Sequence, residues 1–168
     1  MRALRWLLRM NYQEFKRGWI SGLPETPCGA GSTVAATLKQ RQILSRWLGK
    51  YRIQSVVDVG AGDLNWVRLM DLDIDYQPLD LVPRAPEVKA FNLIEQVPPA
   101  CDMVWCLWLL NHLSDEHAFE AMENLLKTEC RYIVYTWWPG MADFLDICPT
   151  EYAMIKAEKQ SELRLVKC

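Results

Sequence analysis

The sequence predicts an α/β domain built on a doubly wound, mostly parallel sheet. Short apolar runs that are typical of buried strands recur along residues 51–138, and helical or crossover segments separate them. Runs without polar alternation are typical of parallel strands that helices cover on both faces. The chain has 168 residues, of which 51% are hydrophobic, so it is long enough to bury one core. We therefore expect a single domain over residues 1–168.

The first part of the chain, residues 1–50, is expected to hold two helices and a Gly-Ser loop. Leucine and aromatic residues recur at helical spacing over residues 2–17, which predicts an amphipathic helix. Residues 18–32 are rich in Gly, Pro, Ser and Thr and predict a loop. A second helix is expected after this loop and runs to about Leu48, where Gly49 is placed to end it.

The central part of the chain, residues 51–138, is expected to form the sheet. Five apolar runs predict strands at residues 53–59, 76–81, 88–93, 102–108 and 132–137. Two further segments predict helices, at residues 65–72 and 116–126. The remaining residues, 139–168, are expected to form a short C-terminal end with one more strand at 163–166.

The strongest single feature is the glycine-rich turn at residues 56–63, which has the sequence VVDVGAGD. It follows the first predicted strand and opens a predicted helix. In a doubly wound sheet the ligand crevice lies at the carboxyl ends of the strands. Glycines at that place allow a tight turn and let the backbone approach a ligand without a Cβ atom in the way. Gly60 and Gly62 are therefore expected to contact a bound cofactor.

A carboxylate stands at the matching place after the second predicted strand. Asp80 follows Gly60 by 20 residues (80 − 60 = 20). That is about the spacing of the acid that binds a ribose in nucleotide-binding folds. A carboxylate suits this task because it accepts two hydrogen bonds from neighbouring hydroxyl groups. Turn and acid together predict a cofactor that carries a ribose.

A dinucleotide is the alternative cofactor, and two residues count against it. The third glycine of the GxGxxG fingerprint is replaced by Asn65. Asp63 places a negative charge where that fingerprint holds a pyrophosphate at a helix N-terminus. An acidic loop with Asp58 and Asp63 favours a cation instead. S-adenosylmethionine fits because it carries an ammonium and a sulfonium group and no phosphate.

With these residues the chain resembles the class I S-adenosylmethionine-dependent methyltransferases, whose sheet is Rossmann-like, over roughly residues 26–140. The resemblance implies that the glycine turn holds the amino-acid end of the cofactor and that the acid after the second strand binds its ribose. It also implies cofactor contacts after the third and fourth strands. The cofactor-binding residues expected in this way are Asp58, Gly60, Gly62, Asp63, Asp80, Asn92, Leu93, Cys106 and Leu107.

A narrower resemblance links the chain to a group of compact bacterial methyltransferases. It rests on the segments 29–32 (GAGS), 63–66 (DLNW) and 112–113 (HL). The chain departs from that group at Leu107 and Trp108, where the group tends to carry a charged pair. The sheet of the wider family has seven strands and ends in an antiparallel pair. Because only 30 residues follow Trp138 (168 − 138 = 30), a shortened C-terminal end is expected.

The expected reaction is direct methyl transfer to a small molecule or a sugar, at a hydroxyl or an amine. Substrate contacts are expected at Trp108 and Asn111 after the fourth strand and at Trp137 and Trp138 at the end of the fifth. His112 is the candidate general base, because the pKa of histidine lies near neutrality. The Asn/Asp-Pro-Pro-aromatic motif of amino-methylating DNA enzymes is absent from the corresponding loop.

Two other functions stay open at the level of the sequence. Residues 1–50 carry nine Lys/Arg and two Asp/Glu, a net +7, while the rest of the chain carries ten and nineteen, a net −9. The basic segment favours, as a second hypothesis, a methyltransferase that docks on nucleic acid. The third hypothesis is a non-catalytic module that binds S-adenosylmethionine or a partner protein, which the Leu107-Trp108 departure motivates.

Cysteine and histidine usage gives no sign of a metal site. Six Cys occur without a CxxC pair and only two His are present, so no zinc-ligand spacing appears. Arginines interrupt the apolar start of the chain, which is unlike a signal peptide, and no stretch approaches the length of a membrane span. We expect a cytoplasmic enzyme without membrane contact. The sequence leaves open whether a second subunit covers the edge of the sheet in a homo-oligomer.

Overall fold

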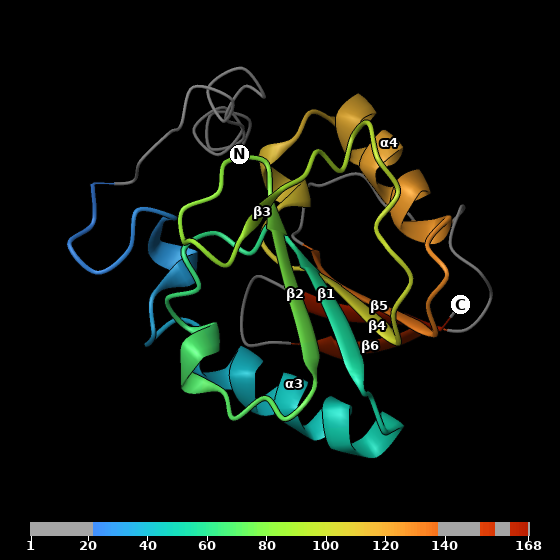
Figure 1. Ribbon diagram of the computed structural model, residues 1–168, viewed down its shortest axis with the longest axis horizontal. Coiled ribbons are helices and arrows are strands. Elements are labelled where there is room, and N and C mark those ends of the chain that lie inside the picture. The colour runs from blue at the N-terminus through green and yellow to red at the C-terminus, as the bar shows by residue number, and fades with distance from the viewer. Residues whose placement is uncertain (1–21, 138–151, 157–161, 168) are drawn as a thin grey trace.

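A seven-stranded sheet forms the centre of the molecule (Figure 1). The computed structural model describes residues 22–137, 152–156 and 162–167. The strand order is β3-β2-β1-β4-β5-β7-β6, and the first five strands pair in parallel. The strands are β1 (Ser55–Val59), β2 (Asp75–Asp80), β3 (Lys89–Ala90), β4 (Met103–Cys106), β5 (Tyr132–Trp137), β6 (Tyr152–Lys156) and β7 (Glu162–Lys167).

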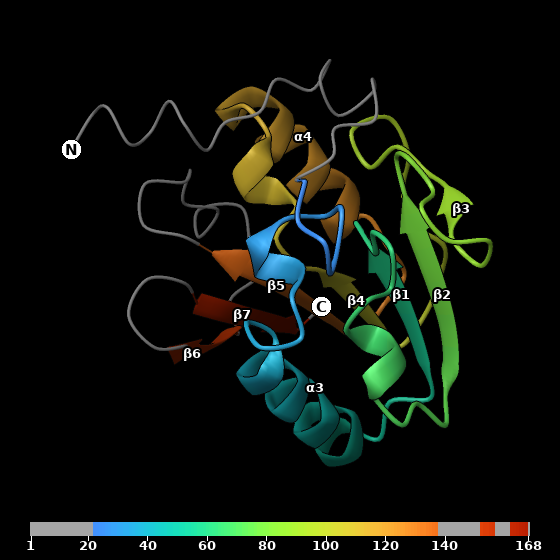
Figure 2. The ribbon, with the colours of Figure 1, turned by 90° about the vertical axis from the view of Figure 1, so that its left-hand side faces the viewer.

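Two helices cover the sheet from opposite sides (Figure 2). Helix α3 (Leu38–Tyr51) lies on one face and α4 (Asp115–Leu126) on the other. Strand β4 shows why its apolar run does not alternate. Met103 and Trp105 pack in the cluster of α3, whereas Val104 and Cys106 pack in the cluster of α4. All four side chains are fully buried, so the predicted doubly wound architecture is confirmed.

Each face has its own apolar cluster. On the α3 face, Ile43, Leu44 and Trp47 of the helix meet the sheet, together with Leu165 of β7. On the α4 face the helix contributes Ala118, Ala121, Met122 and Leu125. The two clusters therefore share one sheet and bury it from both sides.

The C-terminal end of the sheet corrects one expectation. The sequence predicts a shortened end with a single strand at residues 163–166, yet both β6 and β7 are present. Strand β7 lies antiparallel between β5 and β6, so the sheet ends in an antiparallel pair. The hydrophobic pattern did not predict β6, because the run Tyr152–Lys156 is short and ends in a lysine.

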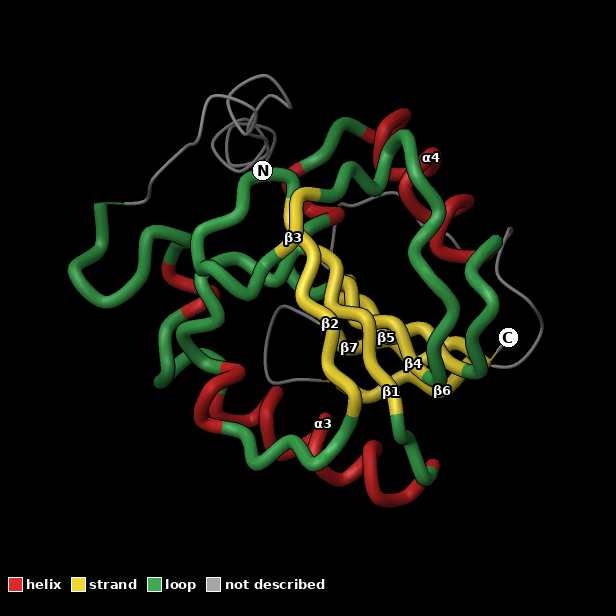
Figure 3. Tube along the Cα trace, viewed as in Figure 1, coloured by secondary structure: helices red, strands yellow, loops and turns green. Residues whose placement is uncertain are grey.

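The helices differ from prediction at their ends. Helix α3 continues through Gly49 to Tyr51 and ends where Arg52 adopts a left-handed conformation, with φ 51°. Helix α4 begins as predicted, because the Ser114 hydroxyl accepts a hydrogen bond from the His117 N–H at 3.2 Å. The helix expected at residues 65–72 is absent, and a single 3-10 turn, Val67–Leu69, lies in a connection that is otherwise loop (Figure 3).

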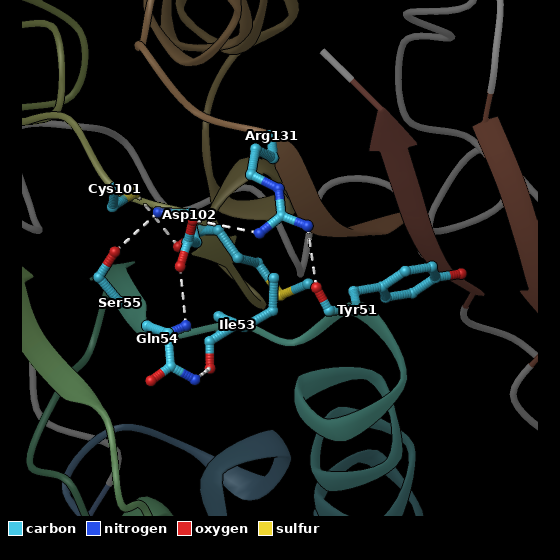
Figure 4. A network of polar contacts seen from close by, with 8 residues as sticks. Tyr51, Ile53, Gln54, Ser55, Cys101, Asp102 and Arg131 are labelled. Carbon is cyan, nitrogen blue, oxygen red and sulfur yellow. Dashed lines mark hydrogen bonds and ion pairs between the residues drawn. The ribbon is translucent and has the colours of Figure 1, made fainter.

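A polar network fixes the edge of the sheet where the parallel strands begin (Figure 4). The Gln54 N–H donates to Asp102 Oδ2 at 2.7 Å, and the Asp102 N–H donates to the Ser55 hydroxyl at 2.8 Å. Arg131 donates to Asp102 Oδ1 at 3.3 Å and to the Tyr51 carbonyl at 2.9 Å. The network joins the starts of β1, β4 and β5 at the end of the sheet opposite the glycine turn.

Candidate functional site

The glycine turn lies at the carboxyl end of β1, beside the ends of β2 and β4. Gly60 and Gly62 both have left-handed backbone, with φ 88° and 62°. The N–H groups of Gly60 and Ala61 donate to the Leu79 carbonyl at 2.8 and 3.1 Å, so the turn is pinned to β2. In the strand order, β2 lies on one side of β1 and β4 on the other. The turn therefore stands at the switch point where ligands bind in doubly wound sheets.

Asp80 ends β2 and faces the same turn. Its Oδ2 accepts a hydrogen bond from the Gly62 N–H at 2.9 Å, and its Oδ1 accepts one from the Val82 N–H at 3.0 Å. Burial raises the pKa of Asp80, and these N–H groups and the nearby Arg84 oppose the shift. The carboxylate is thus held in one orientation, and each oxygen keeps a lone pair for a ligand.

Asp58 is a second acid beneath the turn, and it has a partner that the sequence analysis missed. Its side chain is buried in β1, and the Tyr76 hydroxyl of β2 donates to its Oδ2 at 2.5 Å. Burial raises the pKa of Asp58 to about 7, and the negative charge of Asp80 adds to the rise, while the Tyr76 hydrogen bond opposes it. The site therefore holds an acid that titrates near neutrality.

Both turn glycines are in close contact with other segments. A Cβ atom on Gly60 would lie 3.2 Å from the Cβ of Leu109, and one on Gly62 would lie 2.8 Å from the Sγ of Cys28. Burial raises the pKa of the Cys28 thiol to about 11, and the negative charge of Asp63 contributes. The left-handed backbone favours glycine at both positions, and a Cβ atom at either one would force a neighbour to shift.

The segment before α3 is fastened to the loop that follows the turn. Asn65 Nδ2 donates to Glu25 Oε1 at 2.9 Å and to the Ser32 carbonyl at 3.0 Å. The Val34 N–H also donates to Glu25 Oε1, at 2.6 Å, and this bond lowers the pKa of Glu25. Asn65 occupies the third position of the glycine fingerprint, so the residue that argues against a dinucleotide also docks this segment.

Trp108 follows β4 and connects the segment to the sheet. Its φ of 56° is left-handed, which is rare for a bulky residue and stores strain. Its backbone N–H donates to the Thr136 hydroxyl at 3.2 Å, and its indole N–H donates to Gln40 Oε1 at 3.0 Å. The ring lies against Gly31, at 3.4 Å from the place of a Cβ atom there. The predicted substrate residue Trp108 thus joins the end of β4 to β5, to α3 and to the segment before α3.

The side chains of four predicted cofactor residues lie in a local turn or in the apolar clusters. The Asn92 Oδ1 accepts from the Ile94 N–H at 3.2 Å, which closes a local turn. Leu93 and Cys106 are buried in the α4 cluster, and Leu107 is buried in the α3 cluster. The structure thus gathers the glycine turn and its acids, while the side chains of these other residues pack in the core or bond locally.

The remaining predicted residues lie at the carboxyl ends of β4 and β5. Asn111 and His112 belong to a 3-10 turn, Leu110–His112, and the Asn111 Oδ1 is buried without a hydrogen-bond partner among the described residues. Trp137 is the last residue of β5, where its backbone pairs with Glu162. Trp138 and the predicted helix at residues 2–17 lie outside the described residues.

Sequence reasoning missed the residues that come from outside the motifs. Tyr76, Gln40 and Cys28 reach the site from β2, from α3 and from the loop before α3. Cys28 stands next to the glycine-rich segment 29–32 and Tyr76 begins the predicted strand 76–81, but neither position was assigned to the site. Within the described part of the chain, no group of three or more His, Cys, Asp or Glu is placed to hold a metal ion. The described helices also include none that is long and apolar enough to cross a membrane.

Comparison with known proteins finds similarity in structure only. No protein-family model matches this sequence, and neither does any curated protein sequence. The solved N-methyltransferase NodS from Bradyrhizobium japonicum WM9, in complex with S-adenosyl-L-homocysteine, is 12% identical with a TM-score of 0.67. That similarity covers 93% of this chain and 97% of the NodS chain.

Two other solved structures share the arrangement. Magnesium protoporphyrin IX methyltransferase (ChlM) from Synechocystis PCC 6803, solved with bound SAM, is 16% identical with a TM-score of 0.61, and the similarity covers 99% of this chain and 96% of the other. An rRNA methylase from Escherichia coli is 12% identical with a TM-score of 0.52, over 82% of this chain and 68% of the other. At such identities the shared property is the fold.

Proposed function

We propose that this chain, which has the class I methyltransferase fold, binds S-adenosylmethionine and transfers its methyl group to a small molecule or a sugar. The observation that carries the proposal is the hydrogen bond between the Gly62 N–H and Asp80 Oδ2, at 2.9 Å. It joins the glycine turn to the ribose-type acid at the switch point of the sheet. The neighbours NodS and ChlM, which were solved with this cofactor or its product, support the same reading.

The charge of the site fits a cationic ligand. Asp63 and Asp80 flank the glycine turn, the buried Asp58 lies beneath it, and the connection that follows contains only the 3-10 turn Val67–Leu69. A pyrophosphate would face these carboxylates without the N-terminus of a regular helix to receive it. An ammonium group would be attracted to the same acids. The residues present therefore fit S-adenosylmethionine and disfavour a dinucleotide.

Different residues of the site are proposed to bind different parts of the cofactor. S-adenosylmethionine supplies an electrophilic methyl group on a sulfonium. Asp80 is placed to accept hydrogen bonds from ribose hydroxyls, and the backbone of Gly60 and Gly62 lets the ligand approach β1 closely. The acids Asp58 and Asp63 favour the ammonium end. Holding an acceptor and a methyl group in line supplies much of the rate of such a displacement.

For the acceptor we propose a hydroxyl or an amine of a small molecule or a sugar. Trp108 and Asn111 after β4 are the proposed contacts, together with Trp137 and Trp138. A buried Asn111 Oδ1 without a partner among the described residues supports a polar group on the acceptor. His112, next to Asn111 in the same turn, is the proposed general base. His112→Ala should then lower turnover and leave the affinity for S-adenosylmethionine unchanged.

Calorimetric titration with S-adenosylmethionine and S-adenosylhomocysteine tests the cofactor. The wild-type chain should bind both, and Asp80→Asn should bind each roughly 10- to 100-fold more weakly, because a charge-assisted hydrogen-bond acceptor is lost. Asp73→Asn removes the same charge from an exposed position in the loop before β2 and is the matched control. Equal affinities of the wild type and Asp80→Asn would remove Asp80 from the site.

A second measurement separates the three functional hypotheses: a small-molecule or sugar methyltransferase, a nucleic-acid methyltransferase and a non-catalytic module. The protein is incubated with labelled S-adenosylmethionine and, separately, with a small-molecule extract, a glycan pool and RNA. Label in small molecules or glycans supports the proposal, whereas label in RNA that falls steeply with salt favours the nucleic-acid hypothesis. Cofactor binding without label in any pool favours the non-catalytic module.

A further inference from the structure

A buried amide at the start of α3 has a donor that is not used. Gln40 is 8% exposed, and its Oε1 accepts a hydrogen bond from the Trp108 indole N–H at 3.0 Å. Its Nε2 is buried and has no hydrogen-bond partner among the described residues. A buried N–H group without a partner costs free energy, and native structures contain few of them. The Nε2 of Gln40 is therefore a candidate donor to an acceptor group of a ligand.

The orientation of this amide is fixed by chemistry. The indole N–H of Trp108 is a donor only, so the Gln40 atom that faces it must be the oxygen. A flipped amide would place two donors against each other. The N–H groups of Gln40 are consequently available to an acceptor other than Trp108.

A chain of contacts connects this amide to the glycine turn. Trp108 lies against Gly31 of the docked segment, and the next residue, Leu109, lies against Gly60 of the turn, with 3.2 Å to the place of a Cβ atom. The Trp108 backbone is held to β5 through the Thr136 hydroxyl. Gln40 thus reaches the carboxyl edge of the sheet from the helix, through a residue that is tied to both β4 and β5.

The acids around the turn leave the carboxylate of the proposed ligand without a partner. The turn is surrounded by acids that suit an ammonium group, whereas the same end of S-adenosylmethionine also carries a carboxylate. That carboxylate needs N–H donors to lie among these acids. Asn65 Nδ2 already donates to Glu25 and to the Ser32 carbonyl. Among the described residues, Gln40 Nε2 is a buried amide donor without a hydrogen-bond partner, and its side chain is connected to this edge through Trp108.

We infer that Gln40 is a binding residue for the carboxylate at the amino-acid end of S-adenosylmethionine. Its Nε2–H donates to a carboxylate oxygen, and Trp108 holds the amide in the required orientation. The inference rests on the proposed function, since it concerns the same ligand. It gives the left-handed Trp108 a reason to persist, because its ring positions Gln40 while it packs on Gly31.

The test compares two ligands that differ only at the end in question. S-adenosylhomocysteine has the amino-acid end, and 5′-methylthioadenosine has the adenosine and the thioether without it. Both are titrated calorimetrically into the full chain and into Gln40→Met, which keeps the length of the side chain and removes the Nε2 donor together with the oxygen that accepts from Trp108. Gln42→Met, two residues along the same helix at an exposed position, is the matched control.

Gln40→Met should bind S-adenosylhomocysteine about tenfold more weakly and 5′-methylthioadenosine as well as the wild type does, because only the former offers a carboxylate. Gln40→Glu should lose more affinity for S-adenosylhomocysteine, since it sets a negative charge against the carboxylate. Trp108→Phe, which keeps an aromatic ring and removes the indole donor, should also weaken the binding of S-adenosylhomocysteine selectively. Gln42→Met should change neither affinity.

An equal loss for both ligands in Gln40→Met and Trp108→Phe would overturn the inference, because it would assign Gln40 a structural role. Unchanged binding of S-adenosylhomocysteine in Gln40→Met and Gln40→Glu would overturn it as well. Both results leave the proposed function standing. A wild-type chain that binds neither ligand would instead overturn the proposed function itself.

Discussion

At the scale of the residue, Asp58 makes the stability of this protein depend on pH near neutrality. Burial raises its pKa from 3.8 in the unfolded chain to about 7 in the folded one. The folded state therefore binds more protons than the unfolded state between these values, so stability falls as the pH rises from about 4 to about 7. Between pH 5 and pH 8 the loss due to Asp58 should be on the order of 2 kcal/mol.

Asp58→Asn removes this titration and keeps an oxygen that accepts the Tyr76 hydrogen bond. Denaturant unfolding at pH 5 and pH 8 should show a smaller decline in free energy of unfolding for the variant than for the wild type. Tyr76→Phe is a useful companion, because the Tyr76 hydrogen bond holds the pKa of Asp58 down and its loss should steepen the decline. Parallel pH curves for wild type and Asp58→Asn would contradict the buried-acid interpretation.

Gly62 is a residue whose replacement should be costly for two separate reasons. Its φ of 62° disfavours any side chain, and a Cβ atom would lie 2.8 Å from the Cys28 Sγ. Gly62→Ala should lower the free energy of unfolding by about 1–3 kcal/mol, as left-handed strain and overpacking do elsewhere. Chemical denaturation of Gly62→Ala, Cys28→Ala and the double variant measures the coupling. Strictly additive effects would show that the thiol does not crowd position 62.

At the scale of the element, α3 offers the opposite substitution. Gly49 lies inside the helix, and a Cβ atom there would meet nothing within 4 Å. Gly49→Ala should therefore raise the free energy of unfolding by about 0.5–1 kcal/mol, because alanine favours the helix and restricts the unfolded chain. Thermal unfolding of the variant and the wild type measures the change. A lower melting temperature would mean that the helix ends at Gly49 after all, as the sequence predicts.

The network at the start of the strands predicts a response to acid. The Gln54 N–H and, less strongly, Arg131 hold the pKa of Asp102 below its usual value. Because the folded pKa is lowered, the stabilisation is complete above the unfolded pKa near 4 and is lost as the pH falls through the folded pKa. Asp102→Asn should cost about 1 kcal/mol at pH 7 and less at pH 3.

Urea unfolding at both pH values provides the measurement for Asp102→Asn. Asp73→Asn, in the exposed loop before β2, serves as its control and should leave stability within about 0.5 kcal/mol of the wild type. A cost for Asp102→Asn that is the same at pH 3 and pH 7 would show that the charge of Asp102 contributes nothing.

At the scale of the whole molecule, both apolar clusters share the same sheet, so we expect them to unfold together. Leu44→Ala on the α3 face and Met122→Ala on the α4 face each empty a fully buried position. Each should cost about 2–5 kcal/mol, whereas Phe119→Ala, at a partly exposed position of α4, should cost much less. Fluorescence and circular dichroism should give coincident transitions for each variant. Separate transitions would show that the faces fold independently.

The extent of successful prediction follows the range of the interactions involved. The strands at β1, β2, β4 and β5 and the helix α4 were predictable, because continuous apolar runs and a Ser114 cap are local signals. The absence of a helix at residues 65–72 was not predictable from local signals. The first residue of that segment, Asn65, is hydrogen-bonded to Glu25, 40 positions away. The same holds for the site: the glycine turn is local, whereas Tyr76 and Gln40 reach it only through folding.

The bare connection between the glycine turn and β2 has a consequence for discrimination among adenosine-containing metabolites. Many such molecules share the adenine and the ribose that Asp80 is placed to receive, and most carry phosphates. A regular helix at this point would lend its N-terminal dipole to those phosphates. This chain has the 3-10 turn Val67–Leu69 there and keeps carboxylates around the turn. Under the proposed function, the absence of a regular helix would therefore give phosphate-bearing nucleotides no dipole attraction, and the acids would favour a positively charged ligand.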